Sequence, residues 1–257
     1  MQSTNNITGS GIEYKIAKPS TQLSDFVESF WMLENPSGTA HEAVGLPDGR
    51  VDIIFSFSAT EPFNAVLIGL GTEAGEHSIP SKIVMCAVSF KLLAIEYLLD
   101  IKAASLLNTA LPLPTGFWGI KKSDLEDFEG FCKKLSAKMI SLIKSDIDSR
   151  KQKLFDLIYS SNGSLSVKEL SDKVFWSSRQ INRYFNEQFG ISLKAYCNIL
   201  RFKTSLYHIK KGKLFPELNF ADQAHFIKEI KKFSGVVPKE LFKNQLRKNV
   251  GHLLRID

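Results

Sequence analysis

Basic and amide side chains recur at helical spacing within one short segment of the chain. Arg179, Asn182, Arg183 and Asn186 follow one another at intervals that place them on one side of a helix. Arg and Asn can each make two hydrogen bonds at once to a base edge, Arg to guanine and Asn to adenine. With their polar neighbours they make six candidate base-contacting residues, namely Ser178, Arg179, Gln180, Asn182, Arg183 and Asn186.

A related segment follows at an offset of 45 residues, so that residues 177–191 align with residues 222–236. Each copy begins with a residue that can cap a helix N-terminus and ends at a glycine that suits a left-handed C-terminal cap, Ser177 with Gly190 and Asp222 with Gly235. An apolar i, i+4 stripe runs along each predicted helix. The second copy supplies further candidates for DNA contact, with the last two best suited to phosphates: Gln223, His225, Lys228, Lys231 and Lys232.

The flanking residues predict the elements that would position these side chains. Ser166 and Glu169 form a capping box that opens a short helix, which gives a first helix-turn-helix over about 165–190. Ser192 caps a connecting helix from Leu193 to about Lys210, and a second helix-turn-helix spans about 214–236. Two major-groove faces on one side of B-DNA lie about 34 Å apart, so one chain could engage both.

Residues 153–243 resemble the DNA-binding domain of the AraC/XylS family of bacterial regulators. The resemblance is carried by the runs that start at Ser178 (Ser-Arg-Gln-Ile-Asn-Arg-Tyr-Phe) and at Asp222 (Asp-Gln-Ala-His-Phe-Ile-Lys-Glu-Ile). It implies promoter binding and activation through RNA polymerase. Carried onto this chain, it implies that the groove-facing residues are Arg179, Asn182, Arg183, Gln223, His225 and Lys228.

The chain departs from that family between the two units. Family members have a short supporting helix before the second recognition helix, whereas residues 212–220 run almost directly into Asp222. Pro216 discourages a regular helix there, and Asn219 stands where the family has glycine. We therefore expect a truncated second unit, with the base reading concentrated in the first.

Charge divides the chain into an acidic and a basic part. The whole chain carries +6, but residues 1–150 carry −5 and residues 151–257 carry +11. A basic half suits a polyanion such as double-stranded DNA. We predict an acidic α+β domain over 1–147, for regulation or dimerisation, and a basic all-α DNA-binding domain over 148–257.

The acidic half predicts strands followed by helices. Strands are expected over Val51–Phe57, Ala65–Leu70 and Ile83–Phe90, and a helix over Ser24–Leu33. Ser123 to Glu126 predicts a capping box that opens a longer helix. The motifs around Phe30-Trp31, residues 46–52 and Val88-Ser89-Phe90 resemble an N-terminal domain of some AraC-like regulators. That resemblance implies a small-molecule effector or a homodimer.

No catalytic or metal-binding pattern stands out in the acidic half. Candidate polar residues lack a ligand spacing, and the turn Pro47-Asp48-Gly49 explains one of them: His41, Glu42, Asp48, Asp52 and His77. Aromatic residues such as Phe117, Trp118 and Trp176 are expected to pack rather than to bind a ligand. We expect no enzyme, no cofactor and no metal. The alternatives are an N-terminal enzyme or metal-dependent sensor tethered to DNA, and a non-specific nucleic-acid or partner-binding module.

The location of the protein follows from what the sequence lacks. Residues 1–11 carry no secretory signal pattern, and no apolar run approaches the roughly 20 residues of a membrane span. Three cysteines without a close pair fit a reducing compartment, with Cys197 buried and inert. We expect a cytoplasmic regulator that has no membrane partner and that binds duplex DNA in a sequence-specific way.

Overall fold

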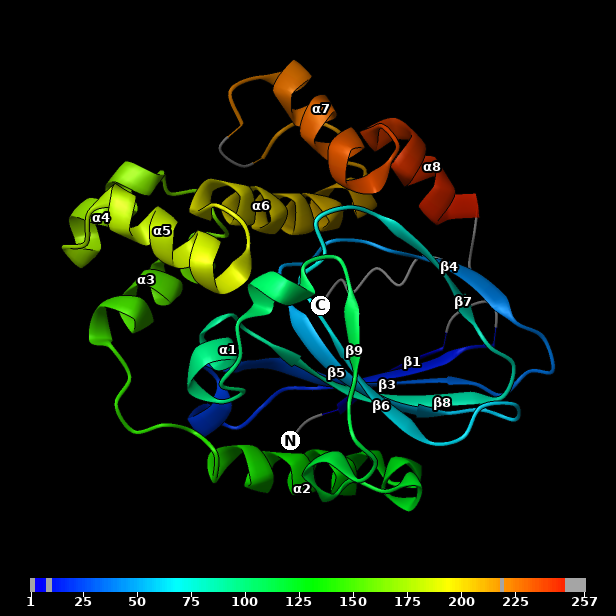
Figure 1. Cartoon of the computed structure of the whole chain (residues 1–257). Helices are drawn as coiled ribbons and strands as arrows, with labels where there is room; N and C mark the ends of the chain where they lie inside the picture. Colours follow the sequence, from blue (N-terminus) through cyan, green and yellow to red (C-terminus); the bar gives the residue numbers. More distant parts are fainter. Residues whose placement is uncertain (1–2, 8–10, 218–219, 248–257) are drawn as a thin grey trace.

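A computed structural model describes residues 3–7, 11–217 and 220–247. An antiparallel sheet comes first along the chain and helices follow it, which confirms the predicted order of an α+β part and an all-α part (Figure 1). Helix α2 lies along one side of the sheet, and the C-terminal helices lie beyond the other (Figure 1). In the part of the chain that is described, no helix has the length and apolar character to cross a membrane.

The main sheet has seven strands in the order β1-β2-β3-β8-β5-β6-β9, with antiparallel neighbours throughout. Its strands are β1 Ser3–Ile7, β2 Glu13–Ala17, β3 Val27–Asn35, β5 Val51–Phe57, β6 Asn64–Ile68, β8 Ile83–Phe90 and β9 Ala110–Pro112. A separate two-stranded sheet pairs β4 His41–Gly45 with β7 Gly75–Ile79. The three predicted strands are confirmed as β5, β6 and β8, although β6 ends two residues early.

The helix predicted over Ser24–Leu33 is wrong, because most of this segment belongs to strand β3. Phe30 and Met32 face the main core, whereas Trp31 and Leu33 join a second apolar cluster on the other face. The strand is therefore buried on both faces, between β2 and β8. A strand of this kind is a continuous apolar run, which periodicity does not separate from a buried helix.

Short helical segments lie between strands of the sheet and before α2. They are η1 Thr21–Leu23, α1 Leu93–Tyr97, η2 Ala103–Leu106, η3 Phe117–Gly119 and η4 Lys122–Glu126, and α2 spans Phe128–Ile140. The predicted helix start at Ser123 is wrong, because Asp127 adopts an extended conformation between η4 and α2. The carboxylate of Asp124 instead accepts a hydrogen bond from the Lys121 amide at 2.7 Å, so this cap belongs to the 3-10 turn.

Within the described residues, six helices follow α2: α3 Ser149–Ser160, α4 Val167–Val174, α5 Ser178–Phe189, α6 Leu193–Lys210, α7 Gln223–Ser234 and α8 Pro238–Arg247. The connecting helix α6 has the predicted bounds. Behind the first helix-turn-helix, the ring of Phe155 on α3 lies 5.8 Å from Phe185 and 6.0 Å from Phe189 on α5. This aromatic core fixes α5 against α3 and leaves its opposite side exposed.

Candidate nucleic-acid interface

Helix α5 begins at a complete capping box. The Ser177 hydroxyl accepts from the Gln180 amide at 3.3 Å, and the Gln180 side-chain oxygen accepts from the Ser177 amide at 3.1 Å. The helix ends at Gly190, whose φ of 75° is the left-handed conformation that glycine adopts without steric cost. Ser166 and Glu169 cap α4 in the same reciprocal way. The segment predicted as the first helix-turn-helix therefore consists of two capped helices, α4 and α5.

The turn between α4 and α5 holds two aromatic residues in different settings. Phe175 has a left-handed φ of 53° and is 88% exposed. Trp176 packs on Tyr184 at 5.4 Å between ring centroids, as the sequence predicts for a packing residue. The Ser171 hydroxyl donates to the Trp176 carbonyl at 2.9 Å and closes the turn.

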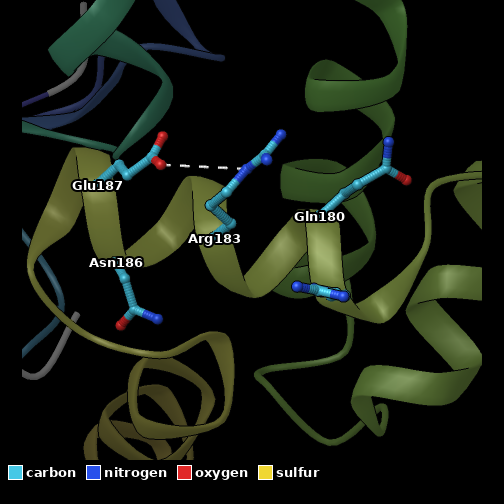
Figure 2. Close-up of a pocket in the computed structure, with 5 residues that line it drawn as sticks. Gln180, Arg183, Asn186 and Glu187 are labelled. Atoms are coloured by element: carbon cyan, nitrogen blue, oxygen red, sulfur yellow. Dashed lines mark ion pairs between the residues drawn. The ribbon is translucent and has the colours of Figure 1, made fainter.

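Helix α5 has one buried and one polar exposed face. Ile181, Phe185 and Phe189 are fully buried. The opposite face lines a shallow surface depression of about 480 Å³, formed by Arg179, Gln180, Arg183, Asn186 and Glu187. Four of these side chains are labelled along the exposed side of the helix in Figure 2. Arg183 Nε lies 4.0 Å from Glu187 Oε1, and both side chains are largely exposed (Figure 2). This ion pair therefore restrains Arg183 only weakly.

Two predicted contact residues on α5 lie away from this exposed face. The Asn182 side chain donates to the Ser178 carbonyl at 3.0 Å and accepts from the Leu193 amide at 3.3 Å. Ser178 and Asn182 are half-buried. Asn182 thus joins α5 to the start of α6, because that start lies beside the first turns of α5. These bonds hold the Asn182 side chain within the protein, so the base contact predicted for it would require the side chain to leave them.

The second unit keeps its recognition helix. The Asp222 carboxylate accepts from the His225 amide at 2.8 Å and caps α7, which ends at Gly235 with φ 77°. Phe226 and Ile230 are buried, whereas the side chains of Lys228, Lys231 and Lys232 are exposed. These three lysines are accessible to phosphates along the length of α7.

The two other candidates on α7 are engaged within the protein. Gln223 donates to the Leu214 carbonyl at 3.0 Å. The His225 ring accepts from the Ala221 amide at 3.2 Å and packs edge-on against Phe220. Both side chains therefore hold the segment before α7 rather than extend from the exposed face.

The supporting helix of the second unit is truncated, as predicted. Between Lys210 and Gln223 the described residues form turns and bends and no helix. Phe220 fills part of its place by packing on Phe226 at 5.2 Å. Asn219, which stands at the family's glycine, lies outside the described residues.

Helix α6 fixes the relation between the two units. Its 18 residues correspond to about 27 Å of helix. Arg201 donates to the Gly163 carbonyl at 2.9 Å, and Asn198 donates to Glu229 of α7 at 3.0 Å. Hydrogen bonds from neighbouring turns of α6 thus hold both the loop before α4 and helix α7.

The family comparison concerns the strand-rich part. Residues 15–112 match a family model described as a domain of unknown function (DUF6597). No curated protein matches the sequence.

Among solved structures, the chain is similar to ToxT from Vibrio cholerae. ToxT of strain O395 has 15% identity and a TM-score of 0.42, with 82% of this chain and 95% of that chain covered. Unsaturated fatty acid-bound ToxT of strain SCE256 has 15% identity and a TM-score of 0.42, covering 94% and 97%. A further ToxT structure at 1.65 Å has 14% identity and a TM-score of 0.42, covering 94% and 98%.

The strand-rich part contacts the side of α5 that adjoins the exposed face. The Tyr184 hydroxyl donates to Glu96 of α1 at 3.0 Å, and Gln188 donates to the Ile101 carbonyl at 2.6 Å. Burial and the Glu96 carboxylate raise the pKa of Tyr184, so its hydroxyl stays protonated as the donor. Lys151 of α3 also binds Glu96, at 2.5 Å. These partners are 55 to 88 residues apart in sequence, so no local pattern predicts the contacts.

The metal and thiol candidates lie in ordinary structural settings. Across the described ranges there is no group of three or more His, Cys, Asp and Glu residues that could hold a metal ion. His41 lies 3.4 Å from the Ser37 hydroxyl, and Asp48 accepts from the Arg50 amide within the predicted turn. All three cysteines are buried. Burial raises the pKa of Cys197 to about 12, as expected of an inert thiol.

Proposed function

We propose that this protein is a transcription regulator that binds double-stranded DNA and reads the major groove mainly with α5. The exposed face of α5 carries the proposal. Arg179, Gln180, Arg183 and Asn186 lie together on a helix that is capped at its start and packed along its other face. Such a helix can enter a major groove and present its N-terminal half to base edges.

The second unit supports binding with less base reading. Lys228, Lys231 and Lys232 are exposed on α7, and Lys168 is exposed on α4. We propose that these lysines contact phosphates, which position the protein without reading sequence. Gln223 and His225 would need to leave their internal hydrogen bonds to reach bases.

The resemblance to AraC/XylS regulators extends this proposal. It suggests that residues 1–147 form a regulatory or dimerisation domain and that residues 148–257 bind promoters as an activator that contacts RNA polymerase. A small-molecule effector acting through the strand-rich part belongs to the same proposal. Footprinting and in vitro transcription with purified polymerase test these finer roles.

The central test is selection of binding sites from random duplexes, followed by affinity measurement at several salt concentrations. A defined motif should emerge. Arg183→Ala should relax one base position and cost about 1–3 kcal/mol at that position. Lys232→Ala should weaken all sequences about equally and reduce the salt slope by about one unit.

Lys138→Ala is the matched control, because Lys138 is exposed on α2, which packs on the sheet away from α5. It should change neither the motif nor the salt slope. Recovery of no motif would refute sequence-specific reading. Equal effects of Arg183→Ala and Lys138→Ala would refute the role of α5.

A further inference from the structure

A second surface depression, here called the junction cleft, lies where the sheet meets α3 and α6. It measures about 390 Å³. Lys18, Glu28, Arg50 and Lys91 line it from the strand-rich part, and Lys203 and Tyr207 line it from α6. The two parts of the chain thus build this cleft together.

Positive charge dominates the junction cleft. Four cationic side chains, Lys18, Arg50, Lys91 and Lys203, face a single carboxylate, Glu28, so the lining carries a net charge of +3. Glu28 is already paired, with Arg50 at 2.9 Å and with Lys203 at 3.9 Å. Burial opposes its ionisation, but the charges of Arg50 and Lys203 prevail and lower the pKa of Glu28 to about 2. Glu28 therefore stays ionised near neutral pH and is shared by Arg50 and Lys203, so the lining residues together keep an excess of positive charge.

The floor of the cleft is a buried charge with an unused donor. The Arg50 side chain is 6% exposed. Its Nη2 binds Glu28, but its Nε is buried and has no hydrogen-bond partner among the described residues. A buried donor without a partner costs about 1–3 kcal/mol.

The rest of the lining combines polar groups with apolar surface from Tyr159 and Leu200. Asn162, Thr204 and Tyr207 contribute amide and hydroxyl groups, and Leu200 is the one aliphatic residue in the lining. This composition does not favour a long apolar ligand. It favours a small polar molecule with more than one negative charge, because several cations can each contribute a charge-assisted hydrogen bond.

From this lining we infer that the junction cleft binds a small dianion, such as a dicarboxylate or a phosphorylated metabolite, between the strand-rich part and the connecting helix α6. The bound anion would contact Lys18 and Lys91 on one side and Lys203 on the other. It would thereby strengthen the attachment of α6, which holds both recognition helices, to the sheet. The binding claim is independent of the proposed function, and only its effect on DNA affinity rests on that function.

Calorimetric titration of the full chain tests the binding claim. The probes are inorganic phosphate, pyrophosphate and succinate, with acetate as a monoanion control, all at equal ionic strength. At least one dianion should bind at one site per chain and more tightly than acetate. Lys203→Gln should weaken it about tenfold or more, which is the loss of one charge-assisted hydrogen bond.

Matched variants locate the site. Lys210→Gln removes an exposed lysine from the same helix and should change the affinity less than about twofold. Lys18→Gln removes an exposed lysine from the other side of the cleft and should weaken binding even if Lys203→Gln perturbs folding. Arg183→Gln should leave the anion affinity unchanged, because Arg183 lies on the exposed face of α5.

Two results would overturn the inference. One is that none of the dianions shows saturable binding up to about 10 mM, a weak limit on the affinity scale. The other is that binding is lost in Arg183→Gln and retained in Lys203→Gln, which would place the anion on α5.

The effect on DNA is read separately. If the anion changes the affinity of the protein for DNA by some factor, DNA must change the affinity of the protein for the anion by the same factor. In Lys203→Gln, the anion should no longer change the affinity for DNA, and DNA should no longer change the affinity for the anion. The variant should still bind DNA when no anion is present. If the unmodified protein binds the anion but does not bind DNA, the proposed function is refuted and the binding claim stands.

Discussion

Replacement of Tyr196 by Phe tests whether a buried hydrogen-bond chain joins the two parts of the protein. The Leu92 amide donates to the Tyr159 hydroxyl at 2.9 Å, and the Tyr159 and Tyr196 hydroxyls lie 3.0 Å apart. Tyr196 donates to the Gly49 carbonyl at 3.0 Å. Since Tyr196 donates to Gly49, Tyr159 must donate to Tyr196, so the bonds run in one direction from α1 through α3 and α6 to the turn before β5.

The Tyr196 hydroxyl makes two short hydrogen bonds, with Tyr159 and with the Gly49 carbonyl, and accepts a long one from the Arg50 side chain at 3.5 Å. The magnitude follows from the two short bonds. Each is worth about 0.5–1.5 kcal/mol net, and a buried donor left without an acceptor costs more. The Gly49 carbonyl keeps a long bond from the Arg50 side chain at 3.3 Å, but the Tyr159 hydroxyl loses its acceptor. We expect Tyr196→Phe to lower the free energy of unfolding by about 2–3 kcal/mol. In a chain of this length that corresponds to a fall in Tm of roughly 5–10 °C.

Urea unfolding monitored by circular dichroism measures this change. Tyr207→Phe on the same helix is the control, because Tyr207 is 40% exposed and should cost less than about 0.5 kcal/mol. A cycle of Tyr159→Phe, Tyr196→Phe and the double variant should give a coupling energy above about 0.5 kcal/mol. Equal losses for Tyr196→Phe and Tyr207→Phe, or strict additivity in the cycle, would refute the hydrogen-bond chain.

Three further predictions rest on single side chains or backbone positions. The pKa of Glu28 is lowered from about 4.5 to about 2 in the folded protein, so its stabilisation is complete above pH 4.5 and is lost as pH falls toward 2. By linkage this amounts to about 3 kcal/mol, and the pH dependence of unfolding should be correspondingly weaker in Glu28→Gln. Gly163→Ala should lower the free energy of unfolding by more than about 3 kcal/mol, because a Cβ would lie 2.5 Å from the Cys197 carbonyl oxygen at a φ of +70°. Thermal unfolding measures this change, and a loss below about 1 kcal/mol would contradict the close approach. Ser177→Ala should cost about 1 kcal/mol by removing the α5 cap, and Ser177→Thr should recover most of it if capping is the cause.

Local chemistry explains which elements could be predicted from the sequence. The caps at Ser166, Ser177 and Ser192 depend on side chains and amides three residues apart, so a short stretch of sequence contains both partners. The left-handed ends at Gly190 and Gly235 are equally local. For that reason the bounds of α4, α5, α6 and α7 follow closely from the residue pattern.

Long-range packing explains what the residue pattern does not indicate. The apolar run of strand β3 is equally typical of a buried helix. Only its pairing with β2 and β8, which are distant in sequence or unrecognised there, identifies it as a strand. Asn182 has the spacing of a base-contacting residue, but the Leu193 amide lies within its reach once α6 has turned back. Arg50 pairs with Glu28, which lies 22 residues away in sequence, so no local pattern indicates this pair. These contacts depend on the tertiary arrangement and leave no local signal.

The way α5 is held limits how the strand-rich part could control DNA binding. Glu96 and the Ile101 carbonyl bind Tyr184 and Gln188, on the flank of the helix. Arg179 and Arg183 remain exposed while these contacts are in place. A signal from the strand-rich part therefore would not need to uncover the proposed reading face. It would act by changing the orientation of α5 relative to α7, and α6 transmits that orientation because its bonds reach both units. Control of this kind should alter the preferred spacing of the two DNA contacts more than the bases that α5 selects, and site selection with duplexes of varied spacing distinguishes the two.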